Sequence, residues 1–384
     1  MAACWAALSA GQSAIGPLTG MPDDVPLRVP VAAQVRNFDP TAHFSPQELA
    51  PLDRFAQFAL LAAREALADA GLEAPLGHQA AVVLGSGIGG INTLDAGFRR
   101  LYLERVHRLN PLSVPRVMQS APVSAVSMAL GITGPCFGVS SACSSANHAL
   151  IQALWLVRAG AAPLALAGGT EACLSPGVIK AWEALRVLAP DTCRPFSVDR
   201  KGLVLGEGAG VLVLEELEHA RARGARIHAE LAGGGMSADA SDIVQPSGEG
   251  AARAMAAALA DAGLTPEAVD YINAHGTGTG ANDVTETRAI RQVFGAHAGR
   301  LAVSSSKSMH GHALGAAGGL EAVATVKALA EGLIPPTANF TRADPACDLD
   351  YVPNEPRHRE IAAALSNAFA FGGLNAVLAF RRFP

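Results

Sequence analysis

Two long stretches without a charged side chain place the strongest limit on what this chain can fold into. Residues 117–157 and 361–380 contain no Asp, Glu, Lys or Arg. Such stretches are normally buried, either in a bilayer or in a protein core. Gly, Ser and Asn interrupt both of them, whereas a membrane span needs about 20 mostly apolar residues in regular structure. We therefore expect no membrane span and two buried segments of a large protein core.

Composition agrees with a large buried interior. Half of the 384 residues are hydrophobic and only 16% are charged, with a formal net charge of −5. These values exclude a disordered chain and a polybasic nucleic-acid binder. The six cysteines show no C-x-x-C spacing, which favours reduced thiols over disulfides or a zinc site. No basic residue precedes Arg28, so we expect a cytoplasmic protein whose N-terminus begins a domain rather than a secretory signal.

Strand-like and helix-like segments alternate along the chain without a linker, which is typical of an α/β architecture. The patterns predict helices that end before a glycine and short apolar strands. A hairpin is predicted around the GEGAG sequence, at residues 203–214. The predicted helices are 55–70 and 251–262, and the predicted strands are 79–84, 269–273 and 301–305. Two halves, residues 1–218 and 219–384, carry similar orders of elements.

The GSGIGG sequence at residues 85–90 follows a predicted strand and matches the dinucleotide pattern G-x-G-x-x-G. That pattern also needs an acidic residue about 20 positions later, at the end of a second strand. The nearest acidic residues, Asp95 and Glu104, do not stand at such a place. A tight turn in which backbone approaches backbone is the better interpretation.

Cys143 is a candidate nucleophile. It stands among small residues in VSSACSSA, and the apolar residues that follow it have helical spacing. At a helix N-terminus, unpaired amides and the helix dipole lower the pKa of a thiol and favour the thiolate. The alternative is an inert core cysteine, which is the commoner state of a buried thiol.

Two histidines follow predicted strands and lie beside glycines. They are His275 in NAHGTGT and His312 in KSMHGHALGAAG. Each could be structural, but together with an activated cysteine they suggest acyl transfer through a thioester. The imidazoles would then donate hydrogen bonds to an enolate or an oxyanion. The FAFGGLN sequence at residues 369–375 could turn a backbone amide into a cleft, although a structural turn explains it equally well.

Together these motifs resemble the β-ketoacyl-acyl carrier protein synthases, most closely the elongating type II enzymes of the thiolase superfamily. The resemblance covers nearly the whole chain, and it also includes SSSKSMHGHALGAAGGLE at 304–321 and CRPFSVDRKGLVLGEGAGVLVLEE at 193–216. It implies an α/β, thiolase-like five-layer αβαβα fold of two pseudo-duplicated halves. Residues 1–218 would carry the nucleophile and residues 219–384 both catalytic histidines, in a homodimer without cofactor or metal.

The resemblance also implies roles. Cys143 would take an acyl chain from an acyl carrier protein, and a malonyl group on the carrier would lose CO₂ and attack that thioester. His275 and His312 would donate hydrogen bonds to the malonyl thioester carbonyl. The amides of Cys143 and Phe371 would form the oxyanion hole. Other residues would support the site or bind substrate: Lys307 and Glu321 as organisers, Phe371 as gate, and Ile88, Thr277, Thr279 and Phe369 at the substrate.

The chain departs from the family pattern at several places. Ala370 stands where glycine is usual, His310 where threonine is common, and Ser197 and Lys201 where aspartates are common. The family also begins with a strand and a glycine turn, whereas this chain starts at the helix that matches residues 4–11. We therefore expect the first sheet to lack one strand, which would leave ladder groups unpaired.

Two functions stay open from the sequence. One is an active, decarboxylating ketosynthase of fatty-acid elongation or of a dedicated type II polyketide-like pathway. The other is a non-catalytic or weakly active partner subunit of a heterodimeric ketosynthase, which typically lacks the cysteine that this chain has. A basic patch could dock an acidic carrier protein, although a solvated helix face fits it equally well; it consists of Arg99, Arg100, Arg105 and Arg108.

Overall fold

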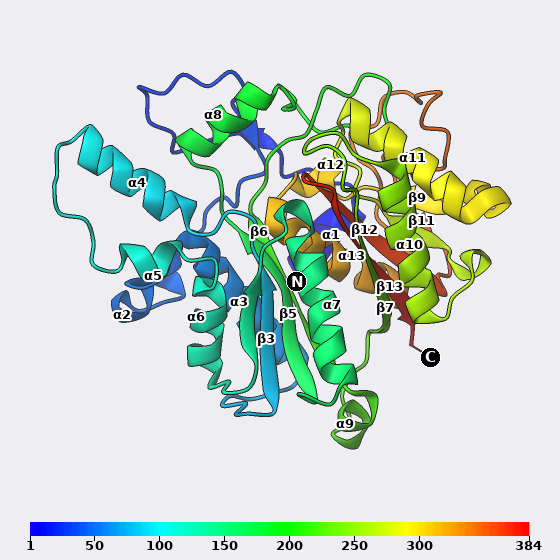
Figure 1. Ribbon diagram of the computed structural model, residues 1–384, viewed down its shortest axis with the longest axis horizontal. Helices are drawn as coiled ribbons and strands as arrows, with labels where there is room; N and C mark the ends of the chain where they lie inside the picture. The colour runs from blue at the N-terminus through cyan, green and yellow to red at the C-terminus, as the bar shows by residue number, and fades with distance from the viewer. Residues whose placement is uncertain (384) are drawn as a thin grey trace.

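Two β-sheets form the centre of the protein, with helices between them and on both outer sides (Figure 1). The computed structural model describes residues 1–383. The first sheet has the order β4-β3-β5-β6 and consists of β3 (Ala80–Gly85), β4 (Cys136–Val139), β5 (Leu164–Glu171) and β6 (Gly208–Glu215). The second has the order β7-β13-β12-β8-β9 and consists of β7 (Ala229–Ala238), β8 (Tyr271–Asn273), β9 (Ala302–Ser304), β12 (Ala363–Ala370) and β13 (Leu374–Arg382).

The two sheets share a pairing pattern. In the first, β4, β3 and β5 are parallel and β6 is antiparallel to β5. In the second, β9, β8 and β12 are parallel and β13 is antiparallel to β12. Strand β7 adds a fifth strand antiparallel to β13. Within residues 1–383, no strand covers β6 in the corresponding way, so β6 is an edge strand of the first sheet.

The helices complete five layers. Between the sheets lie α7 (Ser145–Arg158) and α13 (Ala317–Glu331), each in contact with strands of both sheets. The outer face of the first sheet is covered by α3 (Arg54–Asp69) and α6 (Ala121–Leu130), and α10 (Gly248–Ala262) covers that of the second, with α11 (Gly280–Phe294) packed on it. The prediction of a five-layer αβαβα fold is confirmed.

Small residues let the middle layer pack closely. A Cβ atom at Gly210 on β6 would lie 2.3 Å from the carbonyl carbon of Gly319 on α13. The central core cluster likewise contains many alanines, such as Ala149 and Ala153 of α7 and Ala322 of α13. Helix backbone can therefore approach sheet backbone, which draws the two halves together around their shared interior.

The remaining elements surround this centre. They are α1 (Ala2–Ser9), α2 (Pro46–Leu49), α4 (Ile91–Tyr102), α5 (Ser113–Val117), α8 (Pro176–Leu185), α9 (Leu217–Ala222), α12 (Lys307–His310), and the short strands β1 (Gly16–Pro17), β2 (Val31–Ala32), β10 (Leu333–Ile334) and β11 (Arg357–His358). Helix α4 has no buried residue and projects at the left of Figure 1. None of the helices in residues 1–383 combines the length and the apolar character needed to cross a bilayer.

Local sequence signals located most elements but misplaced one. Gly263 and Gly332 end α10 and α13 in the left-handed conformation, with φ of 60° and 62°. The predicted hairpin at residues 203–214 is wrong, because β6 is one strand that begins at Gly208. The glycines of this segment permit close backbone contacts rather than a turn. A Cβ atom at Gly206 would lie 2.4 Å from the carbonyl oxygen of His310.

Candidate active site

Cys143 lies on a tight turn between β4 and α7. Residues Ala142–Ser144 form a single 3-10 turn, and Cys143 is only 6% exposed. The hydroxyl of Ser144 lies 2.7 Å from the carbonyl oxygen of Leu374 and 3.0 Å from that of Ala368, and its single proton is shared between them. These two residues flank the hairpin between β12 and β13. The turn that carries the sulfur is thus fastened to the second half of the chain.

The structure brings the three predicted catalytic residues together. Nε2 of His312 lies 3.1 Å from Sγ of Cys143. The rings of His275 and His312 are nearly perpendicular, at 85°, with centroids 5.4 Å apart. Both histidines are almost completely buried. The sulfur comes from the first sheet's side and both imidazoles from the second, so the site exists only where the two halves meet.

Lys307 and Glu321 form an ion pair that has no solvent exposure. Lys307 lies on α12 and Glu321 on α13. The Nζ atom of Lys307 also lies 3.4 Å from Nδ1 of His275. Because an ammonium group only donates hydrogen bonds, Nδ1 must accept, and the ring proton of neutral His275 is therefore on Nε2. His275 is held with a donor group free for a substrate.

The expectation that the helix terminus depresses the pKa of Cys143 is wrong. Burial raises the pKa of this thiol to about 11, and the charge of Lys307 and the backbone N–H groups of Phe371 and Cys143 only partly offset that rise. The physical reason is that a thiolate loses its hydration in this interior, and one short turn of amides does not replace it. The free residue is a thiol, and Nε2 of His312 is the nearest group that can take its proton.

Both histidines of the site are neutral. Burial lowers the pKa of His275 and of His312 well below the usual value, and the charge of Lys307 lowers both further. A neutral imidazole offers one donor and one acceptor nitrogen. The pair can therefore donate hydrogen bonds to a carbonyl oxygen and, at His312, accept a proton from the sulfur.

Apolar side chains predicted to bind substrate surround these groups. The ring of Phe369 meets His275 at 62° with centroids 5.9 Å apart. Ile88 packs against the core cluster that contains Cys143. The backbone N–H groups of Phe371 and Cys143 each lower the pKa of the Cys143 thiol, and they stay the predicted donors of an oxyanion hole.

Thr277 and Thr279 stand on the turn that follows His275. Their hydroxyls are 3.0 Å apart, and that of Thr279 also accepts a hydrogen bond from the N–H of Asn282 at the start of α11. Thr279 therefore has a structural task as a helix cap. The substrate-binding role of both residues stays a prediction.

Two residues of the site were not predicted from the sequence. Glu286 on α11 accepts hydrogen bonds from the N–H groups of His275 and Gly276, each at 2.8 Å. Trp182 on α8 stacks on Phe371, with ring centroids 5.7 Å apart and 22° between the planes. Neither stands in a motif next to its partner, and only the fold brings them there. The amphipathic pattern of α8 is the one signal that could have placed Trp182 on an inner face.

His310 is a third imidazole near this centre. Its Nε2 lies 3.0 Å from Oγ of Ser306, and burial, with the charge of Lys307, lowers its pKa to about 3. It is thus a neutral group that contacts a serine rather than the sulfur. In residues 1–383, no three or more His, Cys, Asp or Glu side chains are grouped as ligands of a metal ion.

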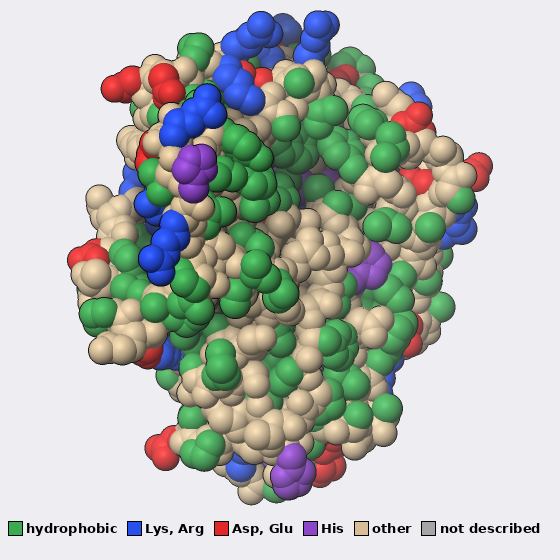
Figure 2. All heavy atoms as spheres, turned by 60° about the vertical axis from the view of Figure 1, so that its left-hand side comes forward, with side chains coloured by type: hydrophobic (Ala, Val, Ile, Leu, Met, Phe, Trp, Pro, Cys, Tyr) green, Lys and Arg blue, Asp and Glu red, His purple; other side chains and the backbone are tan. Residues whose placement is uncertain are grey.

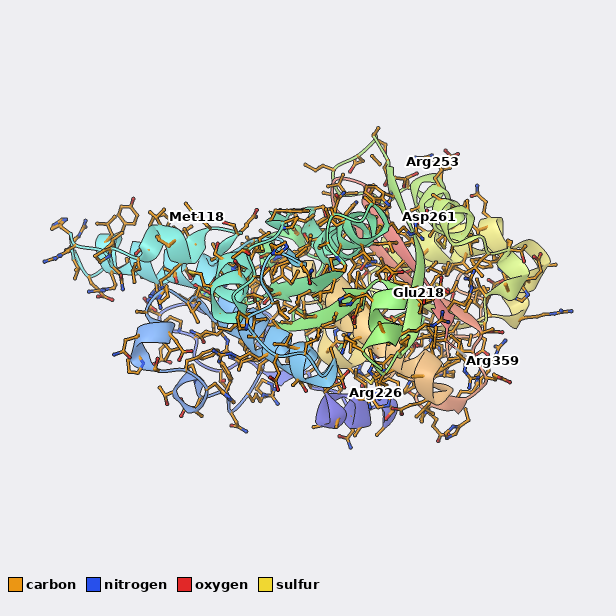
Figure 3. All side chains as sticks on the ribbon, turned by 90° about the horizontal axis from the view of Figure 1, so that it is seen from below. Met118, Glu218, Arg226, Arg253, Asp261 and Arg359 are labelled. Atoms are coloured by element: carbon orange, nitrogen blue, oxygen red, sulfur yellow. The ribbon has the colours of Figure 1, made fainter. Side chains whose placement is uncertain are left out.

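The predicted carrier-docking arginines lie on one projecting arm, which comprises α4, α5 and the segment between them. Arg99 pairs with Asp24 at 3.0 Å, and Arg100 lies 3.9 Å from Glu104. The other two have no acidic partner within the described chain. Figure 2 shows this side of the molecule, where Lys and Arg side chains gather beside a hydrophobic area. In Figure 3, Met118 marks the arm, which extends away from the two sheets.

Two family models match the chain, one after the other. The family model described as "Beta-ketoacyl synthase, N-terminal domain" matches residues 2–220, and "Beta-ketoacyl synthase, C-terminal domain" matches residues 228–341. The chain is 52% identical over 380 residues to nodulation protein E of Rhizobium sp. (strain N33), covering 98% of this chain and 94% of that protein. It is 43% identical over 389 residues to 3-oxoacyl-[acyl-carrier-protein] synthase 2 of Synechocystis sp., covering 99% and 93%.

Solved structures are similar over the whole length. The ishigamide ketosynthase/chain length factor superposes with a TM-score of 0.94 at 36% identity, covering 100% of this chain and 95% of that one. A ketosynthase in complex with a type II PKS acyl-carrier protein and bound to the hexaketide superposes with a TM-score of 0.91 at 31% identity, covering 99% and 94%.

The pKa of the thiol gives a prediction that needs no substrate. Because burial keeps Cys143 protonated, its alkylation by iodoacetamide should speed up about tenfold per pH unit and still rise at pH 9. Peptide mass spectrometry separates Cys143 from the exposed Cys4, and N-acetylcysteine measured in parallel is the reference thiol. A rate at Cys143 that levels off below pH 8 would contradict the burial account.

Proposed function

The chain belongs to the β-ketoacyl synthase family, and we propose that it is an acyltransferase that condenses an enzyme-bound acyl chain with malonyl-acyl carrier protein. The observation that carries this proposal is the buried pair of Cys143 Sγ and His312 Nε2, 3.1 Å apart, with His275 beside it. The relative named 3-oxoacyl-[acyl-carrier-protein] synthase 2 supports it. The reaction would serve fatty-acid elongation or a dedicated type II polyketide-like pathway.

In the first half-reaction, the sulfur of Cys143 attacks the thioester carbonyl of an acyl carrier. Its proton passes to Nε2 of His312 and then to the departing carrier thiolate. The imidazole is then neutral again, and the carrier leaves as a free thiol. The negative oxygen of the tetrahedral intermediate accepts hydrogen bonds from the N–H groups of Cys143 and Phe371. Both amides favour negative charge beside the sulfur, since they lower the pKa of the thiol.

In the second half-reaction, malonyl carrier replaces the free carrier. His312 first moves its proton from Nδ1 to Nε2, the nitrogen that the first half-reaction leaves bare. The malonyl thioester carbonyl then accepts hydrogen bonds from Nε2–H of His275 and of His312, which stabilise the enolate formed as CO₂ leaves. The enolate carbon attacks the acyl thioester, and the intermediate collapses to the β-ketoacyl carrier and the Cys143 thiolate. That thiolate takes up one proton, consistent with its raised pKa. Neutral imidazoles suit this step, because donation rather than proton transfer is required.

The alternative is a partner subunit without activity in a heterodimeric ketosynthase. The similar structure described as a ketosynthase/chain length factor makes this class relevant. Against it stand the cysteine, both histidines and the Lys307–Glu321 pair, which are assembled at contact distance. A subunit that only shapes a partner's pocket has no need of a buried ion pair beside a thiol.

A homodimer is part of this proposal. Strand β4 forms one edge of the first sheet, opposite β6, and large apolar side chains near it are exposed, including Phe137 at 37%, Met128 at 73% and Trp155 at 42%. Pairing two copies of β4 would satisfy the ladder groups of both and cover these side chains. Sedimentation of the purified protein at the mass of one chain would contradict this part of the proposal.

A His275→Ala variant should keep the first half-reaction and lose most of the second. Acylation of Cys143 uses His312 and should continue, whereas decarboxylation of malonyl carrier should fall by about a hundredfold because one enolate donor is lost. Intact-protein mass spectrometry measures the acyl adduct, and CO₂ release measures decarboxylation. His358→Ala, at an exposed position, is the matched control. Unchanged malonyl turnover in the His275 variant would refute the role given to this imidazole, and a missing acyl adduct on wild-type Cys143 would refute the function.

The arm should dock the acidic carrier protein. Exchanging Arg105 and Arg108 for Glu is expected to raise the KM for carrier substrates about tenfold and to leave kcat nearly unchanged, because only the encounter is altered. Arg226→Glu is the control, since Arg226 lies on another part of the surface and is 66% exposed at the side chain (Figure 3). Equal KM values for both variants would favour the alternative of a merely solvated helix face.

A further inference from the structure

A third buried carboxylate, besides Glu321 and Glu286, lies near the catalytic cluster and takes no part in the proposed reaction. Glu171 is the last residue of β5 and has no solvent exposure. Its carboxylate accepts four hydrogen bonds: from the N–H groups of Gly87 (2.7 Å), Gly315 (3.0 Å) and Ile88 (3.3 Å), and from the hydroxyl of Ser86 (3.1 Å). Each oxygen accepts two of these bonds, so the group is fully satisfied.

These bonds join two turns that both line the nucleophile. The turn at residues 85–90 carries Ile88, and the turn at residues 314–316 follows His312 and carries Leu314. Ile88 and Leu314 pack in the same apolar cluster as Cys143. The turns also touch directly, because a Cβ at Gly315 would lie 2.2 Å from the backbone nitrogen of Gly87. The carboxylate of Glu171 therefore connects the turn that carries Ile88 to the segment that follows His312.

The negative charge of Glu171 works against the ionisation of Cys143 that the reaction needs, which indicates a structural role for this carboxylate. Its negative charge raises the pKa of Cys143 and so disfavours the thiolate. Burial raises the pKa of Glu171 itself to about 7, while the surrounding donors lower it. A proton on either oxygen would displace a donor from an atom that already accepts two. The ionised form is thus the one that holds both turns.

We infer that Glu171 is a positioning residue that clamps the turn at residues 85–90, which carries Ile88, to the turn at residues 314–316, which follows His312. The clamp thereby sets which acyl chains the site accepts. The inference rests on the proposed function. The apolar side chain of Ile88 packs against the cluster that contains Cys143, and its backbone N–H donates to Glu171. If the clamp is loosened, the turn can retreat and admit chains that the wild-type wall excludes.

Glu171→Gln tests the clamp with almost no change of shape. The amide nitrogen that replaces one carboxylate oxygen cannot accept hydrogen bonds. The two donors that this oxygen served in the wild type therefore lose their acceptor. The readout is kcat/KM for acylation of Cys143 by carrier thioesters of saturated chains of increasing length. We expect the ratio of long-chain to short-chain kcat/KM to rise about tenfold, the effect of one methylene in an apolar pocket.

Glu215→Gln is the matched control. Glu215 is a largely buried carboxylate on the neighbouring strand β6, at the opposite end of the sheet, where it pairs with Arg223. This variant loses comparable hydrogen bonds and should keep the wild-type chain-length profile. Gly87→Ala is the second test, used also if Glu171→Gln does not fold: its methyl group would lie 3.0 Å from the Glu171 carboxylate and should shift the profile in the same direction.

The outcomes separate this inference from the proposed function. A uniform fall for all chain lengths in Glu171→Gln and Gly87→Ala, or an unchanged profile, would overturn the clamp while the wild type still acylates and condenses. The same shift in Glu215→Gln would also overturn it, because the effect would then be one of general stability. A wild-type protein that forms no acyl adduct would overturn the proposed function and this inference with it.

Discussion

The buried ion pair between Lys307 and Glu321 is the interaction on which the rest of the site depends. An ammonium without any solvent exposure is stable only beside a carboxylate, and this carboxylate comes from α13 in the middle layer. From that position the charge of Lys307 lowers the pKa of Cys143, His275 and His312. It also donates to Nδ1 of His275, so the second ring nitrogen keeps the proton. Burial keeps both imidazoles neutral, and this single cation lowers their pKa further, places the proton of His275 on Nε2 and assists the thiol.

The five-layer fold makes that pair possible. Gly210 and Gly319 let α13 approach β6 so closely that no side chain fits between them, and the alanine-rich interior excludes water. The hydroxyl of Ser144 fastens the nucleophile turn to the hairpin between β12 and β13, which carries Phe371. Hydrogen bonds across the interface between the halves therefore fix the distances inside the site. The same desolvation that positions the groups also keeps Cys143 protonated, which is why a neighbouring base is needed.

Much of this arrangement could be predicted from local sequence. Cys143, His275 and His312 each stand in a glycine-rich or small-residue motif, and Gly263 ended a helix where expected. The predictions from sequence were wrong where burial or long-range packing determines a pKa or the conformation of a segment. The thiol pKa depends on desolvation by residues far along the chain, and the glycines at residues 206–210 serve close contacts with other segments rather than a hairpin. Glu286 and Trp182 could not be found, since only the completed fold brings them to His275 and Phe371.

The central claim is that burial keeps His275 neutral and that Lys307 places its ring proton on Nε2. The most direct measurement is ¹⁵N NMR of protein labelled at histidine, with the signals of His275 and His312 identified by their loss in His275→Gln and His312→Gln variants. The account predicts that between about pH 5 and pH 8 neither imidazole takes up a proton and that His275 keeps a protonated Nε2 and a bare Nδ1. Titration of either ring in that range, or a proton on Nδ1 of His275, would contradict it.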